Sequence, residues 1–198
     1  MQVAISIIRD EHRSIAAVLH GLLYLVGEIK ANNMQPDFAL LGAMLHYIEA
    51  FPEKLHHPKE DDYLYRALRK RDADSADILD VLEAEHVAGR QLIIDLKARL
   101  AEYQQTGAEA FEAFDQAVEQ FADFHWAHMR KEEDIILPRA EAALTEDDWQ
   151  AINTAFQSNQ DPIVGIDTRQ EFRKLFSRIA SLAPAPIGLG PPASPKNR

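Results

Sequence analysis

The chain contains no cysteine among its 198 residues. This absence excludes disulfides, thiolate catalysis, and iron–sulfur or zinc sites held by cysteine. Any metal would therefore depend on histidine and carboxylate side chains. Long apolar runs are missing too, because no segment approaches the roughly 20 apolar residues of a membrane-spanning helix. The N-terminus, MQVAISIIRDEHRS, lacks the layout of a signal peptide. We therefore expect a cytoplasmic protein.

Basic residues are outnumbered by acidic ones. The chain has 21 Lys and Arg against 32 Asp and Glu, which gives a net charge of −11. Such a charge disfavours nucleic acids and anionic membrane surfaces as partners, and mildly favours a cationic ligand. The apolar content of 46% is ordinary for a globular protein.

Glycine and proline are sparse before residue 158, and strand-like alternation is absent. The apolar spacing predicts an all-α fold with helices over 3–31, 38–71, 76–104 and 108–142. Capping boxes predict two further short helices over 146–157 and 169–182. We expect 1–143 to form an antiparallel up-down four-helix bundle. We expect 144–184 to be a helical extension on the bundle or a partner subunit, and 185–198 to be a disordered tail.

Histidines interrupt the apolar stripes of these predicted helices. His12 lies between Ile8 and Ile15, and His86 lies between Leu82 and Ile93. Two further histidines are followed four residues later by a glutamate, as His56/Glu60 and His128/Glu132. An i, i+4 pair lies on one face of a helix, one turn apart. If these faces point inward, imidazoles and carboxylates meet at one depth in the core.

An internal repeat supports this interpretation. Adding 74 maps Glu11-His12 onto Glu85-His86, and adding 72 maps His56 and Glu60 onto His128 and Glu132. The chain therefore reads as two helical hairpins related by a pseudo-twofold axis, each giving two histidines and one carboxylate. Such ligands suit a pair of iron, zinc or manganese ions, because a carboxylate can bridge two cations.

The motifs DEHRSI, LHHPKEDDYL, AEHVAG and HWAHMRKEEDIILP resemble those of hemerythrin-like (HHE cation-binding) proteins, over about residues 5–138. The resemblance implies a four-helix bundle around a non-haem di-iron centre, with Glu60 and Glu132 as bridges. The ligands that it implies are His12, His56, Glu60, His86, His128 and Glu132.

One departure concerns the third helix, where oxygen-carrying hemerythrins supply a second histidine one turn away. Leu82 and Arg90 flank His86 at that spacing, which argues against reversible oxygen carriage. Candidates for a further ligand are His125, His57 and Glu53. Pro52 and Pro58 should kink the helix over 38–71, which leaves its facing open.

The surroundings of the site are predicted from position alone. We expect Glu11, Glu85 and the acids that follow Glu60 to face water. Tyr63, one turn beyond Glu60, is placed to donate a hydrogen bond to a ligand on the metal.

Three functions compete. The first is a cytoplasmic di-iron protein that binds or senses oxygen, nitric oxide, peroxide or iron. The second is a redox enzyme that consumes peroxide or supports iron–sulfur cluster repair; the repair branch usually carries a cysteine, and this chain has none. The third is a structural bundle with a vestigial or zinc-filled site. The apolar faces of the C-terminal helices also suggest a homodimer.

Overall fold

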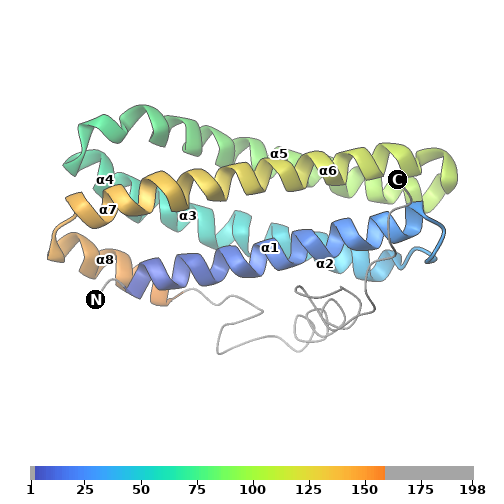
Figure 1. Cartoon of the computed structure of the whole chain (residues 1–198), viewed down its shortest axis with the longest axis horizontal. Helices are drawn as coiled ribbons and strands as arrows, with labels where there is room; N and C mark the ends of the chain where they lie inside the picture. The colour runs from blue at the N-terminus through green and yellow to red at the C-terminus, as the bar shows by residue number, and fades with distance from the viewer. Residues whose placement is uncertain (1–2, 159–198) are drawn as a thin grey trace.

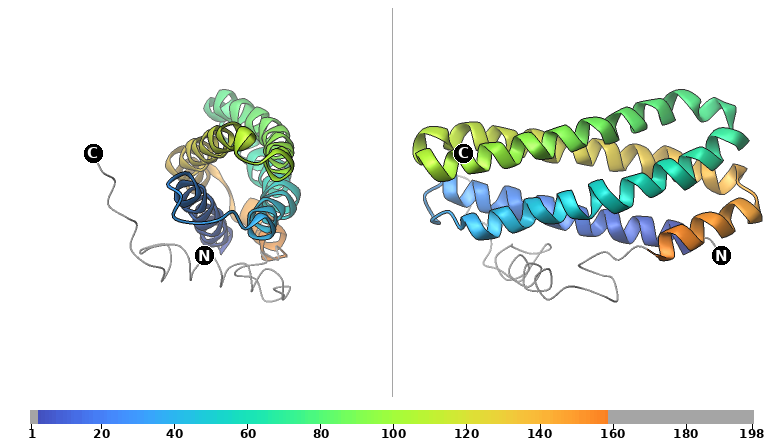
Figure 2. Two further views of the ribbon diagram at one scale, coloured as in Figure 1. Left: turned by 90° about the vertical axis from the view of Figure 1, so that its right-hand side faces the viewer. Right: turned by 180° about the vertical axis from the view of Figure 1, so that it is seen from behind.

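The computed structural model describes residues 3–158, and all of its regular structure is helical within that range. The long helices are α1 (Val3–Lys30), α2 (Phe38–Ala50), α5 (Ala76–Thr106) and α6 (Ala108–Lys131). They lie side by side as a bundle (Figure 1), and the end-on view of Figure 2 shows them around a common axis. The predicted all-α fold is confirmed. The predicted helix over 169–182 and the tail over 185–198 lie outside the described residues.

The segment predicted as one helix over 38–71 is helical but irregular. After α2 it continues through η1 (Pro52–His56), α3 (His57–Lys59), η2 (Glu60–Tyr65) and α4 (Arg66–Arg71). The elements η1 and η2 are wide π-helical turns. Proline has no backbone N–H, so Pro52 cannot donate the bond that would continue α2. Further along this segment, the amide of His56 reaches back five residues to the Phe51 carbonyl, at 3.1 Å, as in a π-helical turn.

The last part of the bundle repeats this irregularity. Helix α6 passes into a third π-helical turn, η4 (Glu132–Ile136), and then into α7 (Leu137–Ala143). Adding 72 maps Glu60, the first residue of η2, onto Glu132, the first residue of η4. The helical widening therefore follows the internal repeat.

The turns between the long helices contain residues suited to their backbone conformations and a side-chain helix cap. Asn32 adopts a positive φ of 58° after α1, and the Asp37 side chain caps α2 by accepting from the Leu40 amide at 2.9 Å. A 3₁₀ turn, η3 (Ala73–Ser75), leads into α5. Gly107 joins α5 to α6 with a φ of 72°, which L side chains rarely adopt.

The apolar core is divided into two clusters. On α1, Ile8 belongs to one and Ile15 to the other; on α5, Leu82 and Ile93 are divided in the same way. His12 and His86 fall between these pairs in sequence. The polar residues thus interrupt the core at one depth, with apolar packing on both sides.

Helix α8 (Glu146–Gln157) packs against α1 and η2. The Asn153 side chain accepts from the Ala4 amide at 2.8 Å. Phe156 is fully buried, with its ring 6.3 Å from that of His56. Within residues 3–158, no helix combines the length and apolar character needed to cross a membrane.

We predict that Asp148→Ala loosens α8. The Asp148 carboxylate accepts from the Thr145 hydroxyl at 2.6 Å and from Arg71 Nε at 2.8 Å, so it both completes a capping box and ties α8 to α4. Its loss should lower the free energy of unfolding by about 1–2 kcal/mol and the melting temperature by roughly 2–8 °C. Thermal unfolding followed by circular dichroism measures this.

Asp147→Ala is the matched control, because it removes a neighbouring acid from the same helix turn. Bonds from Arg71 and Thr145 lower the pKa of Asp148 to about 2. A depressed pKa stabilises the fold above the unfolded value of about 3.9, and this stabilisation is lost as the pH falls through 2. The wild-type advantage should therefore shrink from pH 5 to pH 2. Equal melting of the two variants at pH 7 would refute the capping role.

Candidate metal centre

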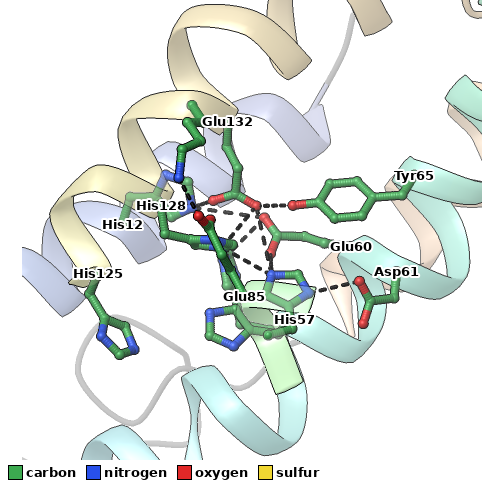
Figure 3. A network of polar contacts seen from close by, with 12 residues as sticks. His12, His57, Glu60, Asp61, Tyr65, Glu85, His125, His128 and Glu132 are labelled. Carbon is green, nitrogen blue, oxygen red and sulfur yellow. Dashed lines mark hydrogen bonds and ion pairs between the residues drawn. The ribbon is translucent and has the colours of Figure 1, made fainter. Parts of the chain in front are cut away.

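A cluster of polar side chains lies buried between the two apolar clusters. Its members come from α1, η1, η2, α5, α6 and η4, and each is at most 3% exposed. Figure 3 shows the carboxylates of Glu60 and Glu132 pointing toward one another at its centre. The members are His12, His56, Glu60, His86, His128 and Glu132.

Two groups of these side chains have ligand atoms within 4.8 Å of one another. The first contains His12, His56 and Glu60; the second contains His57, Glu60, His86 and His128. Glu60 belongs to both groups. The arrangement could hold two cations that share one carboxylate.

The hydrogen bonds of His86 and His128 test whether a cation fits. Their Nδ1 atoms lie 2.7 Å from Asp61 and 3.0 Å from Glu85. An ionised carboxylate only accepts, so each Nδ1 donates its hydrogen. The two Nε2 atoms, 3.0 Å apart, then face each other as lone-pair acceptors when the rings are neutral. A cation near both nitrogens satisfies them, so the residues fit a metal.

The other half of the cluster has the same design. His12 Nδ1 lies 2.9 Å from Glu133, and His56 Nδ1 lies 2.7 Å from Glu11. The Nε2 atoms of both rings are buried without a hydrogen-bond partner. They face the carboxylates, at 3.2 Å between His56 and Glu60 and 3.3 Å between His12 and Glu132. Four imidazoles therefore direct their Nε2 atoms, which carry no hydrogen when the rings are neutral, toward the centre of the cluster.

The expectation that Glu11 faces water is wrong, because Glu11 is 2% exposed and contacts His56. Glu85 keeps 20% of its side chain exposed, and it contacts the His128 ring rather than only water. Asp61, in the acidic run after Glu60, also binds a histidine, although 31% of its side chain is exposed. The internal repeat could have indicated that these acids share a role, because it maps Glu11 onto Glu85 and Asp61 onto Glu133. A carboxylate on the second imidazole nitrogen fixes the ring tautomer and orientation.

The three candidates for a further ligand occupy different places. His57 lies in the second group, with its ring stacked 4.3 Å from that of His86. Glu53 Oε2 lies 3.4 Å from His57 Nδ1, and Glu53 Oε1 lies 3.4 Å from His125 Nε2. Glu53 and His125 belong to neither group among the described residues, and Figure 3 shows His125 apart from the carboxylates.

Glycine makes room for this buried contact. A Cβ on Gly89 would lie 3.1 Å from Glu53 Oε1. Such an approach is tighter than nine in ten real Cβ contacts, so a side chain at 89 would require Glu53 to shift by a few tenths of an ångström. The glycine in the α5 stripe therefore belongs to the polar site rather than to a helix break.

The prediction for Tyr63 is also wrong. Its side chain is 43% exposed, beside α8 rather than at the cluster. The hydroxyl that reaches the cluster belongs to Tyr65, which is fully buried and donates to Glu132 Oε1. Sequence spacing missed it because the π-helical turn η2 shifts residues after Glu60 relative to a regular helix.

Burial and neighbouring carboxylates strongly shift the pKa values of histidines in the cluster. Burial would lower the pKa of His56, but the Glu60 charge and the Glu11 hydrogen bond outweigh it and raise the pKa to about 9. Burial would also lower the pKa of His128, but the Glu132 charge and the hydrogen bonds with Glu132 and Glu85 outweigh it and raise the pKa to about 10. Burial lowers the pKa of His57 to about 3. The buried carboxylates thus stabilise positive charge beside them, which protons or metal cations can supply.

A surface groove leads to the His12 side of the cluster. It has a volume of about 510 Å³ and lies between α1 and α6. Its lining includes His12 and Glu133 from the site, together with Ala16, His20, Trp126 and Met129. A small molecule in the groove would therefore contact a ring of the cluster.

The fold and the site define a helical bundle with a buried histidine and carboxylate cluster that could hold metal. The family model described as the hemerythrin HHE cation binding domain matches residues 3–140. The chain therefore belongs to the hemerythrin HHE cation-binding family. A search of curated proteins found no match. The matched range includes every residue of the cluster and ends before α8.

We predict that divalent zinc or iron stabilises the fold. A cation gives the bare Nε2 atoms and the Glu60 oxygens a partner that exists only in the folded chain. At a free concentration 100 times Kd, binding contributes about 2.7 kcal/mol and raises the melting temperature by roughly 5–11 °C. Thermal unfolding of chelator-treated protein, with and without added metal, measures the shift. Calcium is the control, because it prefers oxygen ligands. An equal shift with calcium, or none with zinc and iron, would contradict the assignment.

Proposed function

We propose that the protein holds a pair of non-haem iron ions in an antiparallel four-helix bundle. We propose that it uses them to bind or sense a small ligand such as oxygen, nitric oxide or peroxide, or iron itself. The observation that carries the proposal is the sharing of Glu60 between two groups of buried imidazoles. Membership of the hemerythrin HHE family supports it. A cytoplasmic location and a homodimer through the C-terminal helices stay predictions from the sequence.

The proposed ligands divide into two sets. His12 and His56 would hold one ion, and His57, His86 and His128 would hold the other. Glu60 and Glu132 lie between the two sets of rings and would serve both ions. When bound, iron would supply redox chemistry and a site for an exogenous ligand. The chain itself fixes the rings: Glu133 and Glu11 orient His12 and His56, while Asp61 and Glu85 orient His86 and His128. We assign Glu53 and His125 to positioning His57.

Two features favour iron over structural zinc. Structural zinc sites are closed and tetrahedral, and in proteins they commonly include cysteine. Here a carboxylate shared between imidazole groups suits two ions rather than one. The groove of about 510 Å³ that reaches His12 also offers a small molecule a route to the site, which a purely structural ion would not need.

We predict that His56→Ala and His128→Ala each lower the metal content from two ions per chain to about one. The two rings belong to different groups, so each loss should empty one position. Metal analysis of iron-loaded protein by mass spectrometry measures the ratio. His46→Ala, on the exposed side of α2, is the matched control, since 59% of that side chain is exposed. Two ions per chain retained in both single variants would contradict the ligand assignment.

We further predict that nitric oxide or azide changes the optical spectrum of the iron-loaded protein, because a small ligand can reach the site through the groove. Filling the groove with Ala16→Trp should slow this change several-fold while the metal content stays the same. Stopped-flow absorbance measures the rate. A spectrum unmoved by either ligand would contradict the binding role. Rapid turnover of peroxide would instead favour the redox enzyme.

A further inference from the structure

Glu132 turns one oxygen toward each set of rings, as Glu60 does. Its Oε2 lies 3.3 Å from His12 Nε2, and its Oε1 lies 3.5 Å from His128 Nε2. The two carboxylates differ in their hydrogen bonds. Both oxygens of Glu60 and Oε2 of Glu132 are buried without a hydrogen-bond partner. Of these four oxygens, only Oε1 of Glu132 has one, because it accepts from the Tyr65 hydroxyl.

Tyr65 is fixed in this position by its surroundings. The side chain is fully buried, and its ring stacks on that of His86, with centroids 5.6 Å apart and planes 7° from parallel. Figure 3 shows its hydroxyl pointing at the Glu132 carboxylate. Adding 72 maps Tyr65 onto Leu137, whose side chain has no hydrogen bond to give. Within the repeat, only one of the two glutamates can therefore receive a hydrogen bond of this kind.

The hydrogen bond does not prevent Oε1 from binding a cation, because each carboxylate oxygen has two lone pairs. It does change how strongly that oxygen binds. A donated hydrogen draws negative charge away from the oxygen and makes it a weaker donor to a metal. The loss is greater for iron(III) than for iron(II), because the more highly charged ion gains more from a negative ligand. Hydrogen bonds to ligands tune metal centres in this way.

We propose that Tyr65 is a positioning residue that, through Glu132, raises the reduction potential of the iron ion beside His128. Oε1 is the oxygen of Glu132 that faces His128 and His86, so the effect falls on that ion rather than on the ion beside His12. The inference rests on the proposed pair of iron ions and gives the two positions different redox properties. With the phenol in place, iron(II) is favoured at the position beside His128.

Redox titration of the iron-loaded full chain tests this. Tyr65→Phe removes only the hydroxyl and keeps the ring that stacks on His86. The equilibrium constant for reduction at one of the two positions should fall roughly tenfold, an effect of the size expected for a hydrogen bond to a charged group. For a one-electron step this lowers the potential by about 59 mV. Tyr103→Phe, a buried tyrosine in the apolar core away from the site, is the matched control and should leave both potentials unchanged.

Mössbauer spectra supply a second readout, which does not depend on the potential. The fully reduced wild type should give two doublets of equal area, one for each iron position. Tyr65→Phe should shift one doublet and leave the other in place, since Oε1 of Glu132 faces one position only. A general loosening of the core would instead broaden both doublets. Metal analysis of the same samples checks that each variant still holds two ions.

Three results would overturn the inference. The first is that the potentials of Tyr65→Phe equal those of the wild type. The second is that both doublets move or broaden equally. The third is that the potential rises and a phenolate charge-transfer band of the wild type disappears, because the phenol itself would then bind iron(III). In each of these cases a wild type that holds two ions leaves the proposed function standing. A wild type that holds none removes both.

Discussion

Buried negative charge is the constraint on which the rest of the structure depends. Glu60 and Glu132 are 0% and 1% exposed and point at one another in the middle of a helical bundle. A carboxylate in such a place is costly unless it is paired with positive charge and hydrogen-bonded. Four imidazoles surround the pair, and each is held through its other nitrogen by a further carboxylate. The core is apolar on both sides of this layer, so the compensating charge must come from within it.

The main chain departs from regular α-helix next to this buried polar cluster. A wide helical turn begins at Glu60 and another at Glu132, and a third begins at Pro52, which cannot continue a regular helix. Turns of this kind are uncommon and gather at functional sites. The two apolar clusters, which flank the layer along the bundle, supply the packing that holds the widened turns in place.

Much of this could be predicted from the sequence. Helix spacing gave the bounds of α1 and α5 to within two residues, and the repeat indicated which histidines and glutamates meet. Spacing could not show which of Tyr63 and Tyr65 faces inward, because η2 departs from the regular helical period. Nor could it identify the bonds from Glu11 and Glu85 to His56 and His128, which join different helices. A charged residue next to a histidine on a helix is usually solvated, and only the packing of a second helix makes it buried.

Helix α8 has a consequence for where this domain ends. The family match stops at residue 140, yet Phe156 lies fully buried in a T-shaped contact with the His56 ring, and Asn153 accepts from the first turn of α1. A fragment cut at the family boundary would strip the apolar cover from one imidazole and leave the start of α1 without its anchor. We therefore expect stable folding of this bundle to need α8, which lies beyond the range that the family model matches.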